Sequence, residues 1–248
     1  MQGWDFSEFE SRVTESPLPW AFEDLVREKL LTAGSALDLG TGGGEFLLSF
    51  EEELPVEVHA TEGWEPNLPV ARRALGPLGI EVREYDAERG DRLPYDDDSV
   101  DVVLSRHEAY DIGEVGRVLR EGGWLVTQQV DGRNLDDLGA LFGGAPAYPD
   151  VTLEVFRAEA EQAGLIVEVA QEWSGPIRFD SVDTLVSDLR LMPWQLPEDF
   201  TVERYADTLL ALDDQDAPLE FTERRFVLVA HLPIPEPPPS NPFPRWER

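Results

Sequence analysis

A glycine-rich turn is the first feature of the sequence that could do chemistry. The segment SALDLGTGGGEFLLSF, residues 35–50, places Gly40, Gly42 and Gly44 between two apolar runs, just after Asp38. Glycine inside a helix or strand costs about 1 kcal/mol relative to alanine, so this turn indicates a backbone that must meet a ligand closely. In open parallel sheets, the turn from the first strand to the following helix is the usual ligand cradle.

The residue after the glycines favours a ligand without phosphate. The dinucleotide-binding pattern G-x-G-x-x-G needs its third glycine at position 45, where this chain has Glu45. A carboxylate at the mouth of the helix would repel a pyrophosphate. The turn therefore argues against a nicotinamide-dependent oxidoreductase.

Two further carboxylates end predicted strands. Glu62 closes VEVHATE, and Asp86 lies at the end of IEVREYDAE. A carboxylate can accept hydrogen bonds from two hydroxyls or from an exocyclic amine, and its charge strengthens them. The alternative for each is a turn residue or a helix cap, which is common for acids at strand ends.

The elements that position these residues alternate between strand and helix through the first 130 residues. Apolar strand patterns precede each turn, and amphipathic helix patterns follow. Such alternation predicts an α/β fold, with a parallel sheet that carries helices on both faces.

Several segments resemble class I S-adenosylmethionine-dependent methyltransferases. LDLGTGGG at 37–44 looks like the first motif of that family, and LPYDDDSVDVVLSRH at 93–107 is similar to its fourth-strand motif. VGRVLREGGWLVTQQV at 115–130 resembles the helix, glycine turn and fifth strand that follow. The resemblance covers about residues 34–170 and 225–232. It implies a seven-stranded, mostly parallel Rossmann-like sheet with a helical cap between the last two strands.

The resemblance also implies S-adenosylmethionine as the cofactor. Glu62 would accept bonds from both ribose hydroxyls, Asp86 would bind the adenine amino group, and Asp38 would face the cofactor's ammonium. Trp64 could pack on the adenine face. The expected cofactor-binding residues are Asp38, Gly40, Thr41, Gly42, Gly44, Glu62, Gly63, Trp64, Asp86, Ala87, Ser105 and Arg106.

The methyl acceptor is expected near the end of the fourth strand. Methyl transfer is an in-line displacement that depends on alignment and on exclusion of water, and it needs a base only if the acceptor loses a proton. His107 is the candidate base, because the ordinary pKa of histidine is about 6.5. The alternative for His107 is a helix cap or a local hydrogen bond. The expected substrate-binding residues are His107, Tyr110 and Trp194.

The chain is expected to have four parts. Residues 1–33 form an N-terminal helical segment over the active site, and residues 34–172 with 223–233 form the cofactor domain. Residues 173–222 form a helical substrate cap, because a stretch of that length between two strands is too long for a simple loop. Residues 234–248 form a proline-rich tail.

The composition excludes several classes of protein. The chain has 51 acidic and 20 basic residues and a net charge of −31, which repels nucleic acid. It has no cysteine and three histidines, which argues against disulfides and a zinc site. No run approaches the roughly 18 apolar residues of a membrane helix, and the N-terminus lacks the pattern of a signal peptide, so we expect a cytoplasmic protein.

These observations predict a methyltransferase that transfers a methyl group to an O, N or C atom of a small molecule. Two alternatives stay open: a methyltransferase acting on RNA or protein, and a non-catalytic protein that binds S-adenosylmethionine. The absence of an N-P-P-F-type tetrapeptide after the fourth strand counts against methylation of a base or amide nitrogen. The sequence leaves the acceptor and the oligomeric state open.

Overall fold

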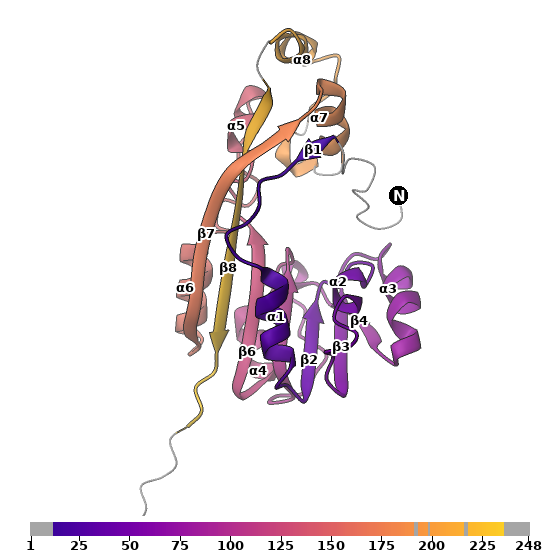
Figure 1. Cartoon of the computed structure of the whole chain (residues 1–248), viewed down its shortest axis with the longest axis vertical. Coiled ribbons are helices and arrows are strands. Elements are labelled where there is room, and N and C mark those ends of the chain that lie inside the picture. Colours follow the sequence, from indigo (N-terminus) through magenta and orange to yellow (C-terminus); the bar gives the residue numbers. More distant parts are fainter. Residues whose placement is uncertain (1–11, 191–192, 198, 216–217, 236–248) are drawn as a thin grey trace, which may run out of the picture.

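A computed structural model describes residues 12–190, 193–197, 199–215 and 218–235 (Figure 1). The N-terminal aromatic residues at positions 4 and 6 and most of the proline-rich tail lie outside these ranges. The described strands are β1 Val13–Thr14, β2 Ser35–Leu39, β3 Glu57–Glu62, β4 Glu81–Glu84, β5 Val100–Arg106, β6 Leu119–Val130, β7 Ile166–Phe179 and β8 Leu219–His231. The α-helices are α1 Phe22–Leu30, α2 Glu45–Leu48, α3 Leu68–Leu75, α4 Ile112–Val118, α5 Asp136–Leu141, α6 Leu153–Gln162, α7 Val182–Leu189 and α8 Ala206–Asp213. Three 3₁₀ turns are η2 Gly76–Leu78, η3 Ala87–Arg89 and η4 Pro193–Gln195.

The strands form one mixed sheet in the order β1-β7-β8-β6-β5-β2-β3-β4. Strands β2 to β6 are mutually parallel, as the alternating sequence pattern predicts. The chain winds from β2 outward to β4 and then returns to β5 on the other side of β2. The order of winding therefore reverses between β2 and β5, and ligands bind open α/β sheets at such a point.

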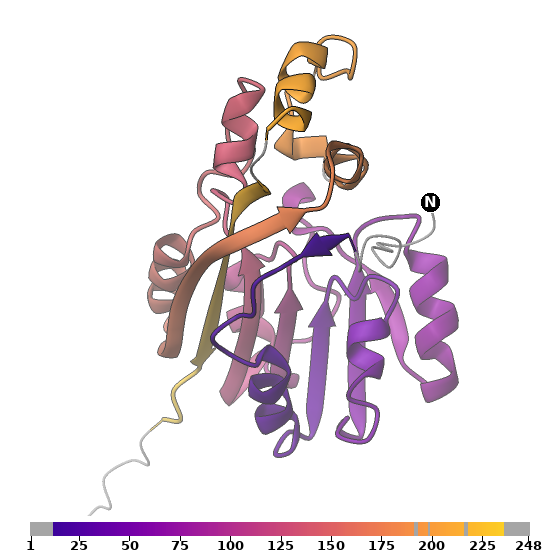
Figure 2. The same ribbon diagram turned by 45° about the horizontal axis from the view of Figure 1, so that its top comes forward.

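Helices cover both faces of this sheet (Figures 1 and 2). The alternation of side chains along a strand sends Leu37 and Leu39 of β2 toward α4 and α6, and Ala36 toward α1. Each face thus has its own buried apolar cluster. Among the described helices, none is long and apolar enough to cross a bilayer.

The sheet has eight strands among the described residues rather than the seven that the sequence predicts. The additional strand is β1, whose two residues pair antiparallel with the end of β7 at Phe179 and Arg178. A two-residue strand carries no detectable period, and its pairing is decided by the partner strand.

The cap is shorter than the sequence predicts, because the last two strands are longer. Strands β7 and β8 stay paired from Ile166 opposite His231 to Phe179 opposite Leu219. Residues 174–179 and 219–222 therefore belong to a long antiparallel hairpin rather than to helices. Figures 1 and 2 show this hairpin extending past the carboxyl ends of the parallel strands, with α5, α7 and α8 at its far end.

The far end of the hairpin has a hydrophobic core of its own. Leu138 of α5, Leu185 of α7 and Leu209 of α8 pack with Phe221 of β8 in one buried cluster. Helix α5 falls in the stretch that the sequence analysis assigned to the cofactor domain, yet it packs with the cap helices. The cap is thus built from two separate parts of the chain.

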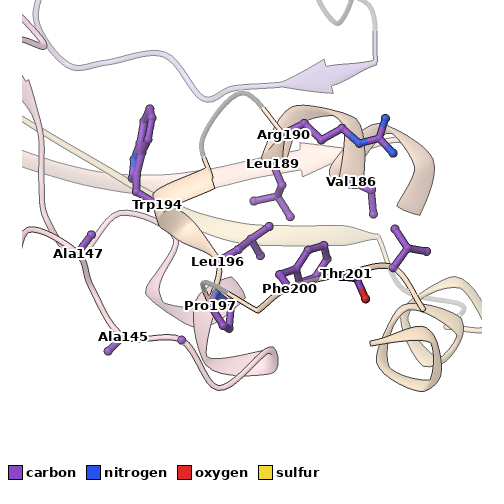
Figure 3. Close-up of a pocket in the computed structure, with 12 residues that line it drawn as sticks. Ala145, Ala147, Val186, Leu189, Arg190, Trp194, Leu196, Pro197, Phe200 and Thr201 are labelled. Carbon is purple, nitrogen blue, oxygen red and sulfur yellow. The ribbon is translucent and has the colours of Figure 1, made fainter. Parts of the chain in front are cut away.

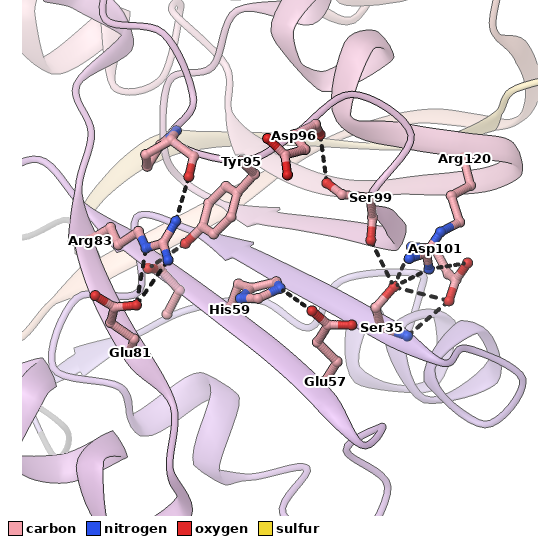
Figure 4. A network of polar contacts seen from close by, with 12 residues as sticks. Ser35, Glu57, His59, Glu81, Arg83, Tyr95, Asp96, Ser99, Asp101 and Arg120 are labelled. Carbon is pink, nitrogen blue, oxygen red and sulfur yellow. Dashed lines mark hydrogen bonds and ion pairs between the residues drawn. The ribbon is translucent and has the colours of Figure 1, made fainter.

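A polar network fixes the start of the central strands, at the end of the sheet opposite the cap (Figure 4). The Asp101 carboxylate of β5 accepts hydrogen bonds from the backbone N–H groups of Gly34 and Ser35, both at 2.9 Å. Arg120 of β6 donates to the other Asp101 oxygen at 3.1 Å. Partial burial raises the pKa of Asp101, but the hydrogen bonds from these donors outweigh it and leave the pKa below its ordinary value. The network ties β2, β5 and β6 together in register.

We expect Asp101→Asn to lower the free energy of unfolding by about 1–2 kcal/mol at pH 7, since an amide cannot accept from all these donors. Urea unfolding followed by circular dichroism measures the change. Glu51→Gln, in an exposed turn, is the control and should leave the midpoint in place. An unchanged midpoint in Asp101→Asn would contradict the role of this network.

Candidate functional site

The turn after β2 and the segment after β5 lie side by side at the carboxyl edge of the sheet. Leu39 pairs with Ser105 in the parallel ladder, so both chains leave the sheet at the same level. Residues 40–44 and 106–110 therefore face one space, although more than 60 residues separate them. This is the place where the winding order reverses.

The glycine turn has a backbone that only glycine adopts readily. Gly40, Gly42 and Gly44 have φ angles of 64°, 62° and 93°. A Cβ atom built on Gly42 would meet no atom within 4 Å, so this turn borders open space. Glu45 opens α2 and folds back over Gly43, which places a carboxylate where a pyrophosphate would need a donor.

Glu62 is clamped beside the turn by backbone donors. One of its carboxylate oxygens accepts from the N–H of Gly42 and the other from the N–H of Trp64, each at 2.7 Å. The residue is only 4% exposed, and burial raises the pKa of its carboxyl. The Asn67 side chain and the backbone of Gly63 also stabilise the ionised form of this carboxylate and oppose the effect of burial on its pKa. A carboxylate has about four acceptor sites, so ligand hydroxyls would share these oxygens with the protein donors.

Asp38 is a buried carboxylate without a hydrogen-bond partner on Oδ2. It is 2% exposed, and burial together with the nearby Glu62 charge raises its pKa to about 7. The Thr41 hydroxyl and the Arg106 charge lower that pKa only in part. Because a buried polar atom without a partner costs about 1–3 kcal/mol, this oxygen fits a site that meets a cationic ligand.

Asp86 already has partners within the protein. Its Oδ1 accepts from the N–H groups of Glu88 and Arg89, and its Oδ2 lies 2.9 Å from Arg89 Nε. The helix-cap alternative is therefore realised, and an adenine contact would have to share this carboxylate. Gly63 packs closely against this segment: a Cβ atom built on Gly63 would lie 2.8 Å from the carbonyl oxygen of Tyr85.

Ser105 and Arg106 end β5 in different environments. Ser105 is fully buried and donates to the carbonyl oxygen of Glu108 at 3.0 Å, so it supports the loop rather than lining the open space. Arg106 is exposed, and its guanidinium lies 4.9 Å from the ring centre of Phe46 on α2. In the described part of the chain, no carboxylate oxygen lies within 4 Å of that guanidinium.

His107 has a strained backbone, and one of its ring nitrogens already has a hydrogen-bond partner. Its φ is 62°, and its N–H donates to the carbonyl oxygen of Gln128 at 2.8 Å. Trp20 donates to Oε1 of Gln128 at 2.8 Å, which leaves the Gln128 amide nitrogen as donor toward His107 Nε2 at 3.2 Å. This network assigns the proton of the neutral ring to Nδ1.

The surroundings of His107 disfavour its expected role as a base, and that role stays a prediction. Desolvation by the surrounding protein, with the charges of Arg225 and Arg106, lowers the pKa of the His107 ring to about 3. A group with that pKa holds a proton poorly at neutral pH. His107 is instead suited to donate a hydrogen bond from Nδ1.

The other two predicted substrate residues lie apart from the glycine turn. Tyr110 packs edge-on against Phe156 of α6, with ring centres 5.5 Å apart, and belongs to the core on that face of the sheet. Trp194 borders a cavity of about 920 Å³ within the cap, whose other walls include Leu189, Leu196 and Phe200 (Figure 3). The lining contains no residue from the turn or from the end of β5.

Glu108 is outside the lists of expected cofactor- and substrate-binding residues, although the sequence places it with His107 and Tyr110 in the segment that could face the acceptor. A Cβ on Gly40 would overlap the Glu108 side chain, so this carboxylate lies directly over the first glycine of the turn. Its position in the sequence, one residue after His107, was the available signal. Its closeness to Gly40 follows only from the pairing of β2 with β5.

The comparison with known families decides the identity of this arrangement. A family model described as a methyltransferase domain matches residues 37–127, a span that begins in β2 and ends in β6. By this match, residues 37–127 form a methyltransferase domain. The matched stretch includes the glycine turn, Glu62 and the end of β5, so the site lies within this domain.

Two curated relatives share part of this methyltransferase domain. The Bacillus subtilis protein YcgJ, named an uncharacterized methyltransferase, is 24% identical over 164 residues, covering 58% of this chain and 62% of YcgJ. The demethylmenaquinone methyltransferase of Roseiflexus castenholzii is 28% identical over 97 residues, covering 39% of this chain and 40% of the relative. The chain thus matches about three fifths or less of the length of these relatives.

Solved structures show the same α/β methyltransferase fold. The crystal structure of Bacillus subtilis YcgJ aligns with a TM-score of 0.60 at 18% identity, covering 86% of this methyltransferase and 98% of YcgJ. The [4+2]-cyclase SpnF aligns with a TM-score of 0.56 at 17% identity, covering 90% and 87%. Identities this low carry the fold and no more.

We expect Asp38→Asn to stabilise the ligand-free methyltransferase increasingly as the pH rises. The unfolded chain ionises Asp38 near pH 4, whereas the folded protein resists ionisation until about pH 7, so wild-type stability is lost across that interval. The difference in unfolding free energy between variant and wild type should grow by about 2 kcal/mol from pH 5 to pH 8. Urea unfolding at both pH values measures it, and a difference that does not change with pH would contradict this account of Asp38.

Proposed function

We propose that the chain transfers a methyl group from S-adenosylmethionine to an O, N or C atom of a small molecule. The proposal is carried by the Glu62 clamp beside the open glycine turn. Two backbone N–H groups hold both carboxylate oxygens in place, one of them from Gly42, where the turn borders open space. A vicinal diol of a ribose offers two matching hydroxyl donors.

The remaining side chains of the site fit the rest of this cofactor. Asp38 offers a buried, unpartnered oxygen for the ammonium group, and Arg106 offers a guanidinium for the carboxylate. Asp86 lies next to Gly63, which follows Glu62, so Asp86, Ala87 and Trp64 are the residues we assign to the base, with Asp86 sharing its carboxylate between η3 and the ligand. When bound, the cofactor supplies an electrophilic methyl group on a sulfonium ion.

The chain's part in the reaction is alignment and exclusion of water. The strained backbone at His107 holds its ring beside β6, where Gln128 fixes the tautomer and leaves Nδ1–H free to orient an acceptor. The cap carried by β7 and β8 lies over the same edge of the sheet (Figure 2). A small acceptor fits this arrangement better than RNA does, because a chain of net charge −31 repels a phosphate backbone.

One neighbour gives weight to a second candidate function. SpnF has this fold and is described as a [4+2]-cyclase, so the fold alone does not fix methyl transfer. A protein that binds S-adenosylmethionine without transferring its methyl group is therefore the alternative. Turnover of labelled methyl groups separates the two.

We expect S-adenosylmethionine at about one hundred times its Kd to raise the unfolding free energy by about 2.7 kcal/mol. In Glu62→Gln the affinity should fall by about 10- to 100-fold, because the amide cannot accept from both backbone donors and lacks the charge that strengthens bonds from hydroxyls. Thermal unfolding with and without the nucleoside measures both.

Glu57→Gln is the matched control, since Glu57 lies exposed at the other end of the same strand. It should bind like wild type. Transfer of a labelled methyl group to small molecules from a cell extract then tests the reaction. Binding without any transfer would favour the non-catalytic alternative, and equal binding by Glu62→Gln and wild type would overturn the assignment of the site.

A further inference from the structure

The Glu108 side chain occupies a position that nothing in its own segment requires. Its Cγ and Cδ lie over Gly40, in contact with the turn that would cradle the cofactor. Within the described ranges, its carboxylate has no hydrogen bond and no ion pair. The group is partly exposed and could turn toward bulk solvent, yet it lies against the glycine backbone.

The backbone of Glu108 is held rigidly from below. Its carbonyl oxygen accepts from Ser105 Oγ and from Gln129 Nε2, both at 3.0 Å, and Gln129 Nε2 also donates to Thr127 at 2.8 Å. The preceding residue, His107, is in the left-handed region at φ 62°. A buried network and a strained residue thus fix the point from which this side chain reaches the turn.

The charges that face Glu108 come from three other elements and are all negative. Asp38 ends β2, Glu62 ends β3, and Asp86 and Glu88 lie at the start of η3. Arg106, two residues before Glu108, carries a positive charge that acts on Asp38. Burial and these four carboxylates raise the pKa of Glu108 to about 7.

The cluster of carboxylates around Glu108 contains one buried oxygen that has no hydrogen-bond partner. Asp38 is 2% exposed, its Oδ2 has no hydrogen bond, and its charge is one of those felt by Glu108. The cluster therefore faces a space that calls for positive charge. S-adenosylmethionine carries two positive groups, an ammonium and a sulfonium, and its demethylated product carries only the ammonium.

We propose that Glu108 is the charge-compensating group of the cofactor site, ionised while the bound cofactor carries its sulfonium and protonated once that charge is lost. This inference rests on the proposed function. For a protonated acceptor the balance is complete: the acceptor–hydrogen bond and the methyl–sulfur bond break, an acceptor–methyl bond forms, and the sulfur keeps the electron pair of the bond that breaks. The sulfonium becomes a neutral thioether, and the released proton passes to Glu108. The net charge of the site stays constant.

Glu108 is suited to this role, and its neighbour is not. His107 has its Nε2 occupied by Gln128 and lies beside Arg106 and Arg225, so a proton there is disfavoured. Glu108 lies among carboxylates, where a proton is favoured when no cation is present. The two adjacent residues therefore have different roles: His107 donates a hydrogen bond, and Glu108 accepts the proton.

The test is the pH dependence of the affinity ratio between S-adenosylmethionine and S-adenosylhomocysteine, measured by calorimetry on the full chain. Both ligands carry the same ammonium and carboxylate, so the contribution of Asp38 to binding the ammonium cancels in the ratio. For a carboxyl that titrates near pH 7, the preference for S-adenosylmethionine should rise about tenfold from pH 6 to pH 8. In Glu108→Gln the ratio should stay at its low-pH value at every pH.

Two controls keep the outcome clear. Glu121→Gln makes the same charge change at an exposed position near the start of β6, at the end of the sheet away from the site. This variant should keep the wild-type pH dependence of the affinity ratio. If Glu108→Gln does not fold, a measurement on the wild-type protein alone tests the proposal. At pH 7, binding of S-adenosylmethionine should release about half a proton more than binding of S-adenosylhomocysteine. Calorimetry in buffers of different ionisation enthalpy measures this proton release.

A ratio that does not change with pH in wild type, or that changes equally in Glu108→Gln, overturns the inference and leaves the proposed function standing. Failure of both ligands to bind wild type overturns the proposed function itself.

Discussion

The parallel pairing of β2 with β5 is the constraint on which the site depends. Leu39 and Ser105 are partners in that ladder, so the glycine turn and the segment after β5 leave the sheet together. The Asp101 network at the other end of the same strands holds this register. A shift of one residue would move Asp38 to the other face of the sheet and separate Glu108 from Gly40.

The site concentrates negative charge where the fold excludes water. Asp38 and Glu62 are almost fully buried, and both have raised pKa values because burial disfavours their ionised forms. Such carboxylates destabilise the ligand-free protein at neutral pH. A cation bound at this site would offset that cost, so the proposed binding and the stability are linked through the same oxygens. Proteins commonly depart from their stability optimum at functional sites in this way.

Local patterns were sufficient to predict the central half of the fold and the strand ends that carry Asp38 and Glu62. The alternation of strand and helix and the glycine spacing are short-range signals, and they located β2 to β6, Asp38 and Glu62 correctly in the chain. The ends of β7 and β8 were missed, because SGPIRF contains glycine and proline and becomes a strand only through pairing with β8.

Long-range contacts also decide what the residues after β5 can do. The tautomer of His107 depends on Gln128 and Trp20, which lie far away in the sequence. Tyr110 is turned into the core by Phe156, and Glu108 meets Gly40 only through the sheet. Residue type and spacing predicted which segment matters, and the tertiary structure determined which side chain in it has which chemistry.

The hairpin of β7 and β8 carries a cap whose buried cluster shares no residue with the clusters of the sheet. Substitutions in the two regions should accordingly have additive effects on stability. Substitutions around Trp194 can then change the cap cavity without disturbing Glu62 or the glycine turn. We therefore expect the lining of the cap cavity to differ more among related proteins than the glycine turn and Glu62.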